Sequence, residues 1–469
     1  MKNSDTLISN QNKYGKELPG VEKHRAEQLS LVSAAREKYN AFISLDVQEL
    51  EKQAADVPES AGEDRNPLSG VTAVLSDNIC SEDMKTTCGS RMLENYLSPD
   101  NAYVVDKLKD AGVSIVGKGN MDEFGVGDSR GVSFFGPSKN PWDIERTAGS
   151  GIAGAVALGE AVFGLGSDAR GGLRQAAAFS GLAGLKPGYG RISRWGLIDY
   201  APSLDQIGII ARSAADIALV LECIAGEDSR DPSTLNNPAP RYTETLKEDV
   251  TGLKLGLLKG WGQVESLEPE VEVLLEKELA RLKDLGCILV EVDLPHFFQA
   301  SSTATIIGAV EAFSTLSNFD GVRFGFRIPS KHLQEMYINS RTEGFGSFLK
   351  QYVTFGALAS SEKYFNEIFV SAQKLRTKIK EELEESLKTV DMIAAPAVPF
   401  RAPLLSDLDS RYGLDSSANI FTAAANLAGN PALTIPVTSD DDLPAGLQLI
   451  GRFFDEGKLL SVLHALENK

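Results

Sequence analysis

Several side chains that could take part in catalysis lie in or near one glycine-rich part of the chain. Residues 164–176 read GLGSDARGGLRQA and include Asp168, Arg170 and Arg174. The surrounding segment, 149–190, is rich in glycine and alanine, a composition typical of tight turns and close backbone packing rather than of a linker. Further groups with hydroxyl, thiol or carboxyl chemistry near such motifs are Ser76, Asp77, Cys80, Ser150 and Ser180.

The histidines and cysteines do not suggest a metal site or a histidine-dependent dyad. A Ser–His or Cys–His pair would require His296 or His332 to approach these motifs from far along the chain. Cys80 and Cys88 lie near each other, but no C-x-x-C pair occurs, and the four histidines lack zinc-binding spacing. We therefore expect free thiols in a reducing cytoplasm, with no metal and no other cofactor.

The composition and net charge argue against nucleic acid and membranes as direct binding partners. The 469 residues carry a formal net charge of −18 and are 42% hydrophobic, as in an ordinary soluble globular protein. An acidic surface argues against a direct grip on nucleic-acid phosphates, which requires clustered lysine and arginine. No run of 18 apolar residues occurs, and the polar N-terminus has no signal or transit pattern, so no membrane contact is expected.

Apolar runs and amphipathic segments alternate along the chain and predict an α/β fold. Buried strands are expected at 71–75, 113–116, 253–258, 287–292, 391–396, 432–437 and 446–450. Helices are expected at 101–111, 216–225, from about 271 to 285, and at 362–388. We predict one large mixed, mainly parallel sheet covered by helices on both faces, within a domain spanning 66–469. Residues 1–65 are predicted to form short helices packed on this core, using apolar residues such as Leu29, Leu31, Val32, Phe42 and Leu45.

The order of short motifs resembles the amidase signature family, and within it the A subunits of glutamyl-tRNA(Gln)/aspartyl-tRNA(Asn) amidotransferases, which release ammonia from glutamine for a partner subunit. The motifs include Asp77–Cys80, Lys85–Cys88, Gly117–Phe124, Asn140–Asp143, Gly184–Pro187, Ser203–Gly208 and Pro444–Gln448. They run in the family's order from about residue 40 to the end. This resemblance implies the amidase signature fold, and it says less about activity.

The resemblance also implies a lysine base, a relay serine and a serine nucleophile, with backbone N–H groups of the glycine-rich turn holding the oxyanion. In this chain the position of the base is Ser76, and the position of the nucleophile is Gly172. The relay segment, 148–154, is about three residues shorter than in the family. Ser150 is either a remnant relay or a small turn residue. The resemblance therefore implies that no catalytic triad is intact.

The pocket and the substrate contacts also depart from the family. The resemblance places the oxyanion turn and its supports at Asp168, Ala169, Arg170, Gly171, Gly172 and Arg174. Arg170 replaces a glycine, and its side chain could either fill the pocket or point into solvent. Asn419 stands where an aspartate would hold the amino group of glutamine. Gln351, with Tyr352, stands where an Arg-Arg pair would meet the carboxylate.

These departures lead to three hypotheses. The first, which the departures favour, is a non-catalytic amidase-fold subunit that serves as a scaffold or binds a ligand. Its protein partner would resemble the amidotransferase B and C subunits, or it would associate with itself. The second is an enzyme with altered chemistry on an amide or acyl substrate in the same cleft. The third is an amidotransferase A subunit with glutaminase activity.

Overall fold

The computed structural model describes residues 37–45, 66–323, 325–408, 417–439 and 443–469. Its strands form one eleven-stranded sheet in the order β1-β3-β2-β4-β6-β5-β10-β11-β9-β7-β8. The strands are β1 (Phe42–Leu45), β2 (Thr72–Ser76), β3 (Ser114–Gly119), β4 (Phe163–Ser167), β5 (Ala183–Lys186), β6 (Ile207–Ala211), β7 (Lys254–Leu258), β8 (Ile288–Val292), β9 (Met392–Pro396), β10 (Ala432–Val437) and β11 (Ala445–Gly451). The predicted mixed α/β sheet is thus confirmed.

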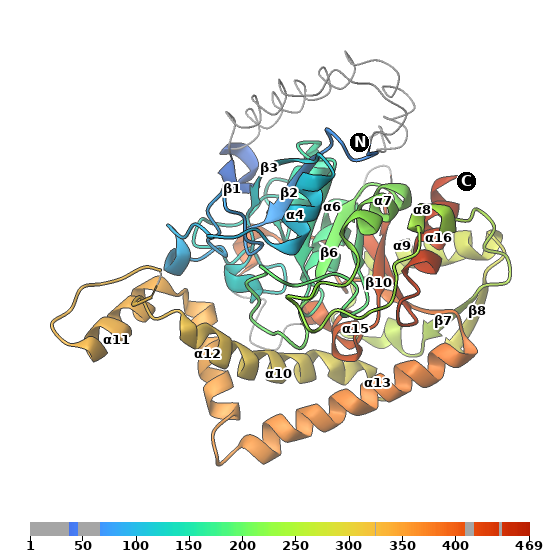
Figure 1. Cartoon of the computed structure of the whole chain (residues 1–469). Helices are drawn as coiled ribbons and strands as arrows, with labels where there is room; N and C mark the ends of the chain where they lie inside the picture. Colours follow the sequence, from blue (N-terminus) through green and yellow to red (C-terminus); the bar gives the residue numbers. More distant parts are fainter. Residues whose placement is uncertain (1–36, 46–65, 324, 409–416, 440–442) are drawn as a thin grey trace.

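Helices cover both faces of the sheet (Figure 1). The helices of the described residues are α4 (Tyr103–Asp110), α5 (Gly151–Leu158), α6 (Gly172–Ser180), α7 (Ala214–Ile224), α8 (Tyr242–Thr245), α9 (Pro269–Asp284), α10 (Ala300–Thr315), α11 (Leu333–Gly344), α12 (Ser347–Ala359), α13 (Ser371–Thr389), α15 (Ala423–Ala428) and α16 (Glu456–Glu467). A π-helical turn, Phe365–Val370, precedes α13 within the helix predicted at 362–388. No helix of these described parts is both long and apolar enough to cross a membrane.

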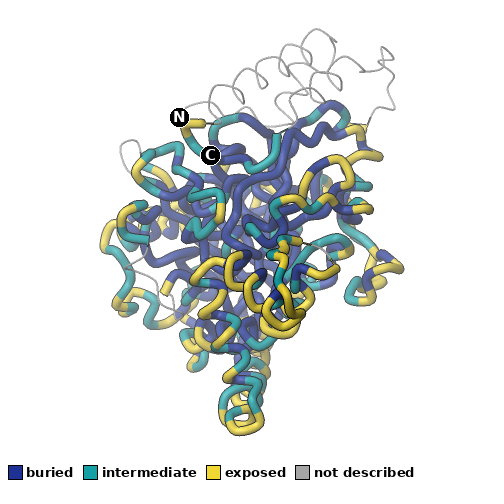
Figure 2. The backbone as a smooth tube through the Cα atoms, turned by 90° about the vertical axis from the view of Figure 1, so that its left-hand side faces the viewer, coloured by how far each residue is buried: buried dark blue, intermediate teal, exposed yellow. Residues whose placement is uncertain are grey.

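Side chains alternate along each strand, so successive residues pack into different cores on the two faces of the sheet. On β2, Ala73 and Leu75 pack in a core with α4, α7, α9 and α16. Val74 points the other way, into a cluster with α5 and α6. Ser76 shares that second orientation, which directs it toward α5 and α6 rather than toward the larger core. Figure 2 shows this buried centre, with exposed backbone concentrated at the periphery.

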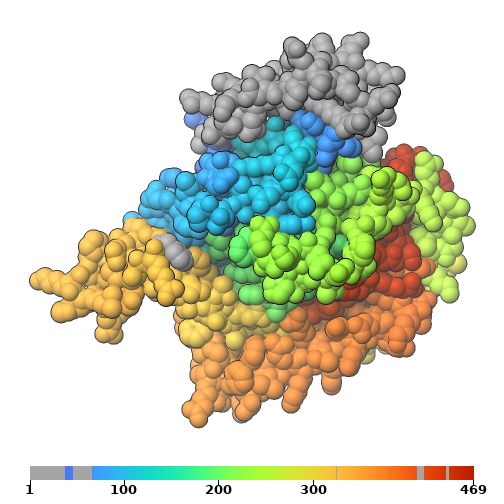
Figure 3. All heavy atoms as spheres, in the orientation of Figure 1, coloured from blue at the N-terminus to red at the C-terminus, as the bar shows by residue number. Residues whose placement is uncertain are grey.

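A second core lies beyond this cluster, where α10, α12, α13 and α15 pack against the other half of the sheet. Its members include Leu258, Ile393 and Ile450, one from each of three strands. Helix α11 projects from the body beside this layer (Figures 1 and 3). The layer supplies Thr305 and Tyr352 to the surroundings of the glycine-rich turn.

Three details of the predicted fold are wrong. Six of the ten strand pairings are antiparallel, so the sheet is not mainly parallel. Strand β8 is an edge strand with Ile288 and Val290 exposed, not a buried one. Phe42–Leu45, expected in a helix, is a strand paired antiparallel with β3. Leu29, Leu31 and Val32 lie outside the described residues.

One buried carboxyl group near the sheet makes stability depend on pH. Glu160 follows the left-handed cap Gly159 of α5 and is 1% exposed, and neither carboxyl oxygen has a hydrogen-bond partner among the described residues. Burial raises the pKa of this carboxyl from 4.5 to about 8. Between these values the folded state retains a proton that the unfolded state has lost, so this group's contribution to stability falls as pH rises.

We therefore expect Glu160→Gln to melt several degrees above the wild type at pH 9, because the neutral amide avoids ionisation in a buried site. The difference should shrink toward zero at pH 4, where the carboxyl is protonated in both states. Melting curves across this range test it, with Glu145→Gln on the exposed surface as the matched control. A Glu160→Gln advantage that is independent of pH would contradict this assignment.

Candidate active site

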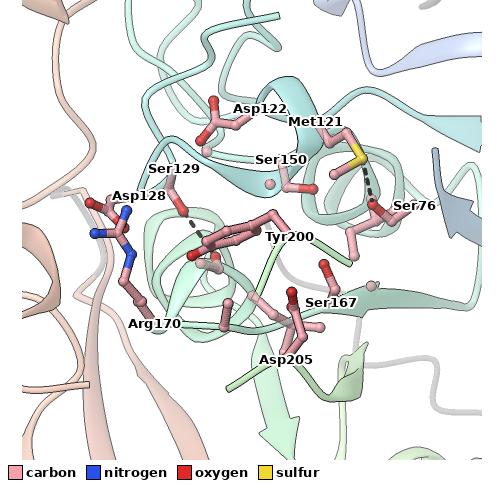
Figure 4. Close-up of a pocket in the computed structure, with 17 residues that line it drawn as sticks. Ser76, Met121, Asp122, Asp128, Ser129, Ser150, Ser167, Arg170, Tyr200 and Asp205 are labelled. Carbon is pink, nitrogen blue, oxygen red and sulfur yellow. Dashed lines mark hydrogen bonds and ion pairs between the residues drawn. The ribbon is translucent and has the colours of Figure 1, made fainter. Parts of the chain in front are cut away.

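The glycine-rich turn forms one wall of a small pocket between β2, α5 and α6 (Figure 4). The pocket volume is about 50 Å³. It brings together residues from five separate segments: Ser76, Met121, Asp122, Gly125, Asp128, Ser129, Gly149, Ser150, Ile152, Gly166, Ser167, Ala169, Arg170, Gly172, Leu173, Tyr200 and Asp205. All three predicted triad positions, Ser76, Ser150 and Gly172, are therefore in one site.

The turn is held by a buried ion pair between Asp168 and Arg174. Arg174 Nε lies 2.9 Å from Asp168 Oδ2, and both side chains are fully buried. Arg174 also donates to the Thr422 carbonyl oxygen (3.1 Å), to Asn426 Oδ1 (2.5 Å) and to Gln448 Oε1. Burial acts to raise the pKa of Asp168, but the charge and hydrogen bonds of Arg174 outweigh it and lower that pKa below 3.8. These two residues support the turn from behind and do not line the pocket.

Two neighbouring glycines in the turn have different roles. Gly171 has φ +119°, and a Cβ there would lie 2.0 Å from Thr422 Oγ1, so the position requires glycine. Gly172 begins α6, and a Cβ there would point toward the pocket, with Ser129 Oγ at 3.9 Å as its nearest neighbour in the described chain. The absence of a side chain at 172 is therefore not imposed by packing.

The hydroxyl groups of the pocket are held differently. Ser76 is buried and donates to Met121 Sδ at 3.3 Å. Ser150 is the N-cap residue of α5, is half-buried and makes no capping hydrogen bond with its side chain in the described structure. Ser167 Oγ accepts a hydrogen bond from Asn78 Nδ2 at 2.9 Å. Ser129 Oγ donates to the Gly172 carbonyl oxygen at 2.9 Å and so lies directly over the start of α6.

Arg170 is buried rather than directed into solvent. Its guanidinium forms an ion pair with Asp128 (Nη2 to Oδ1, 2.8 Å) and donates to Thr305 Oγ1 (2.9 Å). It also stacks over the ring of Tyr352, 5.2 Å from the centroid. The side chain thus leaves the turn toward α10 and α12, on the far side of the pocket from Ser76 (Figure 4).

The two positions that the resemblance assigns to substrate recognition, Asn419 and Gln351, do not line the pocket. Asn419 is fully buried, and its Oδ1 accepts a hydrogen bond from Ser301 Oγ at 2.5 Å. Gln351 is exposed on α12, whereas its neighbour Tyr352 is fully buried beneath Arg170. On α12, Tyr352 therefore contacts Arg170 of the turn, and Gln351 does not.

Other candidate groups lie outside the pocket. Asp77 Oδ2 accepts hydrogen bonds from the N–H groups of Thr87 (3.0 Å) and Gly89 (3.1 Å), so it supports a loop. His296 pairs with Glu382 on α13. The side chains of Cys80 and Ser180 are buried away from the pocket-lining set.

Sequence reasoning missed several pocket residues, among them Ser129, Asp128, Asp122, Tyr200 and Asp205. Asp205 is fully buried, and its Oδ1 has no hydrogen-bond partner in the described chain; burial, followed by the charge of Asp199, raises its pKa well above 3.8. Asp122 accepts hydrogen bonds from the N–H groups of Val132 (2.7 Å) and Arg130 (3.1 Å). Burial raises the Asp122 pKa to about 6. Two motifs noted in the sequence, Gly117–Phe124 and Ser203–Gly208, contain Asp122 and Asp205 and were the available signal for those two residues.

The chain is similar in sequence to named amidotransferase subunits. The A subunit of glutamyl-tRNA(Gln) amidotransferase from Moorella thermoacetica is 42% identical over 420 residues, which are 89% of this chain and 86% of the relative. The protein of the same name from Carboxydothermus hydrogenoformans is 40% identical over 458 residues, 96% of this chain and 94% of the relative.

These relatives correct the function favoured from sequence. The sequence favours a non-catalytic scaffold role, because the resemblance places a glycine and a serine at the positions of the nucleophile and the base. That prediction, and the expectation that the chain is not an enzyme, are wrong: relatives that match nearly the whole chain are named as subunits of an enzyme. The third hypothesis, an A subunit of an amidotransferase, fits this finding better.

Solved structures extend the similarity to the fold. The A subunit of glutamyl-tRNA(Gln) amidotransferase from Thermotoga maritima superposes with a TM-score of 0.82 at 33% identity, over 99% of this chain and 95% of that one. The peptide amidase of Stenotrophomonas maltophilia gives a TM-score of 0.80 at 26% identity, over 99% and 96%. The Amidase family matches residues 27–460. With its single mixed sheet, its braced glycine-rich turn and its pocket, the chain belongs to the amidase family.

Proposed function

We propose that this chain is an A-type amidotransferase subunit that cleaves the C–N bond of a carboxamide and releases ammonia for use by a partner subunit. The observation that carries the proposal is the turn 166–172, braced by Asp168 and Arg174, over a pocket lined by hydroxyl groups. A turn held this firmly is suited to present backbone N–H groups to a reacting carbonyl oxygen.

The start of α6 supplies the polar groups for this chemistry. The first N–H groups of a helix have no acceptor within that helix. The backbone N–H groups of Gly172 and Leu173 therefore donate no hydrogen bond within α6. Both residues line the pocket. Charge that develops on the amide oxygen during attack would be stabilised there, an effect worth about 2.7–4 kcal/mol per donor in a well-placed oxyanion hole.

We further propose that Ser76, Ser150 and Gly172 mark the family's base, relay and nucleophile positions without forming its triad. Ser76 has no basic side chain, and its hydroxyl is turned to Met121. Gly172 has no hydroxyl to acylate. We propose that the group that attacks the amide comes from another residue of the pocket.

The charges around the pocket favour a neutral carboxamide substrate, whose binding needs no partner for a charged amino group or a charged carboxylate. The positive charge of Arg170 is compensated by Asp128, and Asn419 and Gln351 are neutral. A cavity of about 50 Å³ accommodates the carboxamide head group. We propose that simple neutral amides are turned over at least as well as glutamine.

The relatives are named as parts of a larger enzyme, which supports an assembly. We propose a partner resembling the B and C subunits of amidotransferases, in the cytoplasm. We also propose that residues 66–469 form one domain with 1–65 as an N-terminal segment. Limited proteolysis should cleave at 57–66 or upstream first, and early cleavage into two stable halves near residue 250 would contradict that division.

The test of function is ammonia release by the purified chain from glutamine, asparagine and acetamide, followed in a coupled assay. Gly172→Leu should abolish release, because a Cβ at 172 faces the pocket and the larger side chain would occupy it. The melting temperature of this variant should stay close to that of the wild type. Ammonia release that is undetectable, or that Gly172→Leu leaves unchanged, would refute the proposal.

A further inference from the structure

Among the pocket hydroxyls, that of Ser129 lies closest to the position left open at Gly172. Ser129 Oγ is 3.9 Å from the point a Cβ on Gly172 would occupy, and it is hydrogen-bonded to the Gly172 carbonyl oxygen at 2.9 Å. In Figure 4 its hydroxyl faces the turn between Asp128 and Ser150. An amide seated at the start of α6 would therefore meet this oxygen.

The backbone around Ser129 is held in an uncommon conformation. Asp128 and Ser129 have φ of 55° and 61°, two consecutive left-handed residues that are not glycine. Each such residue is strained and persists only where the surroundings fix it. Strain of this kind concentrates at functional sites.

Two contacts provide that fixation. The Asp128–Arg170 ion pair, with both side chains nearly fully buried, joins this segment to the turn itself. Gly149 allows the second contact, because a Cβ there would lie 2.9 Å from Ser129 Cβ. Arg170, unexpected in the turn, thus acts as a positioning residue that holds the Ser129 segment above Gly172.

The other hydroxyls are less well placed for attack. Ser76 is engaged with Met121, and Ser167 is held by Asn78. Ser150 lines the same pocket at the N-terminus of α5 and makes no capping contact with its side chain in the described structure.

We propose, resting on the function proposed above, that Ser129 is the nucleophile that accepts the acyl group. Ser129 Oγ bonds to the amide carbon while the C–N bond breaks. The Ser129 proton moves to the leaving nitrogen, and ammonia departs. Water then adds to the acyl-Ser129 ester and releases the carboxylic acid, and its second proton restores the Ser129 hydroxyl.

The nucleophile can be located directly with a serine-reactive alkyl fluorophosphonate, followed by peptide mass spectrometry. Phosphonylation at Ser129 is expected in the wild type, and its loss in Ser129→Ala and Ser129→Gly. Ser129→Ala keeps the Cβ and removes only the hydroxyl, whereas Ser129→Gly also relieves the left-handed strain, so a loss shared by both variants reports on the hydroxyl. Ser133→Ala, in the same loop but outside the pocket, is the matched control and should label like the wild type.

The kinetic expectation is a fall in ammonia release of about 10³-fold or more in both Ser129 variants, with unchanged melting of Ser129→Gly. Labelling at Ser150 or Ser167 instead, or no labelling, would overturn the assignment, as would full ammonia release by Ser129→Gly. Failure of the proposed function is distinguishable: a wild type that labels at Ser129 but releases no ammonia from any amide supports the nucleophile and refutes the amide substrate.

Discussion

Replacing Arg174 by methionine is expected to lower the free energy of unfolding by about 3–5 kcal/mol, because the change leaves the Asp168 carboxylate buried without its counter-charge. Methionine keeps an unbranched apolar stem but lacks the guanidinium group and donates no hydrogen bond. Asn426 Oδ1, Gln448 Oε1 and the Thr422 carbonyl oxygen would also lose a donor. Denaturant unfolding measures the effect directly, and the same variant should lose ammonia release because the turn is no longer held.

The control is Arg241→Met, which removes an arginine from an ion pair with Glu244 whose side chains are 78% and 67% exposed. Exposed pairs contribute roughly 0–1 kcal/mol, so this variant should unfold like the wild type. Equal losses in the two variants would mean that the Asp168–Arg174 pair does not organise the turn.

The pH dependence of the Arg174→Met loss follows from the Asp168 carboxyl. Because its pKa is lowered in the folded wild type, the carboxyl contributes stability above its unfolded value of 3.8 and loses it as pH falls through the folded value. The difference between wild type and Arg174→Met should therefore be largest at neutral pH and shrink in acid. A loss unchanged down to pH 3 would point to packing rather than charge.

The sequence predicts strands at the positions of β2, β3, β7, β8, β9, β10 and β11, but not at those of β1, β4, β5 and β6. Strands β7, β9, β10 and β11 lie where expected, because their residues are largely apolar and mostly buried. Strand direction is not encoded locally: β5 and β6 run antiparallel to their neighbours because of how the chain returns between them. The edge position of β8 is likewise not encoded locally, because it depends on the order in which the strands assemble into the sheet.

The site residues divide in the same way, into those that local sequence motifs predict and those that only the tertiary fold brings together. Gly172 and Ser76 are visible in the sequence because motifs of fixed spacing place them. The pairing of Arg170 with Asp128 joins distant parts of the chain through a loop whose conformation has no local signal. Ser129 was missed for that reason, since only its left-handed backbone brings it over Gly172. The contact between Arg170 and Tyr352 depends on the packing of α12 and is equally non-local.

The adjacent glycines of the turn allow a sharp paired experiment. Gly171→Ala should destabilise the protein by about 3 kcal/mol or more, since left-handed strain and overpacking each cost roughly 1–3 kcal/mol. The added Cβ would lie 2.0 Å from Thr422 Oγ1, whose own hydrogen bond to the Arg170 carbonyl oxygen is 2.7 Å. Gly172→Ala should instead be neutral or stabilising by about 0.4–1 kcal/mol, because its Cβ meets no described atom closer than 3.9 Å at the start of a helix.

The two variants are matched in chemistry and adjacent in sequence, so unfolding free energies and ammonia release can be compared directly. If the turn presents backbone N–H groups, Gly171→Ala must lose activity together with stability, because Thr422 cannot move without releasing the turn. Gly172→Ala should keep activity within a few-fold, because attack comes from Ser129 and the new methyl group reaches Ser129 Oγ only at van der Waals distance. Loss of activity in Gly172→Ala with its stability intact would place the substrate against that Cβ, leaving Ser129 without access to the carbonyl carbon.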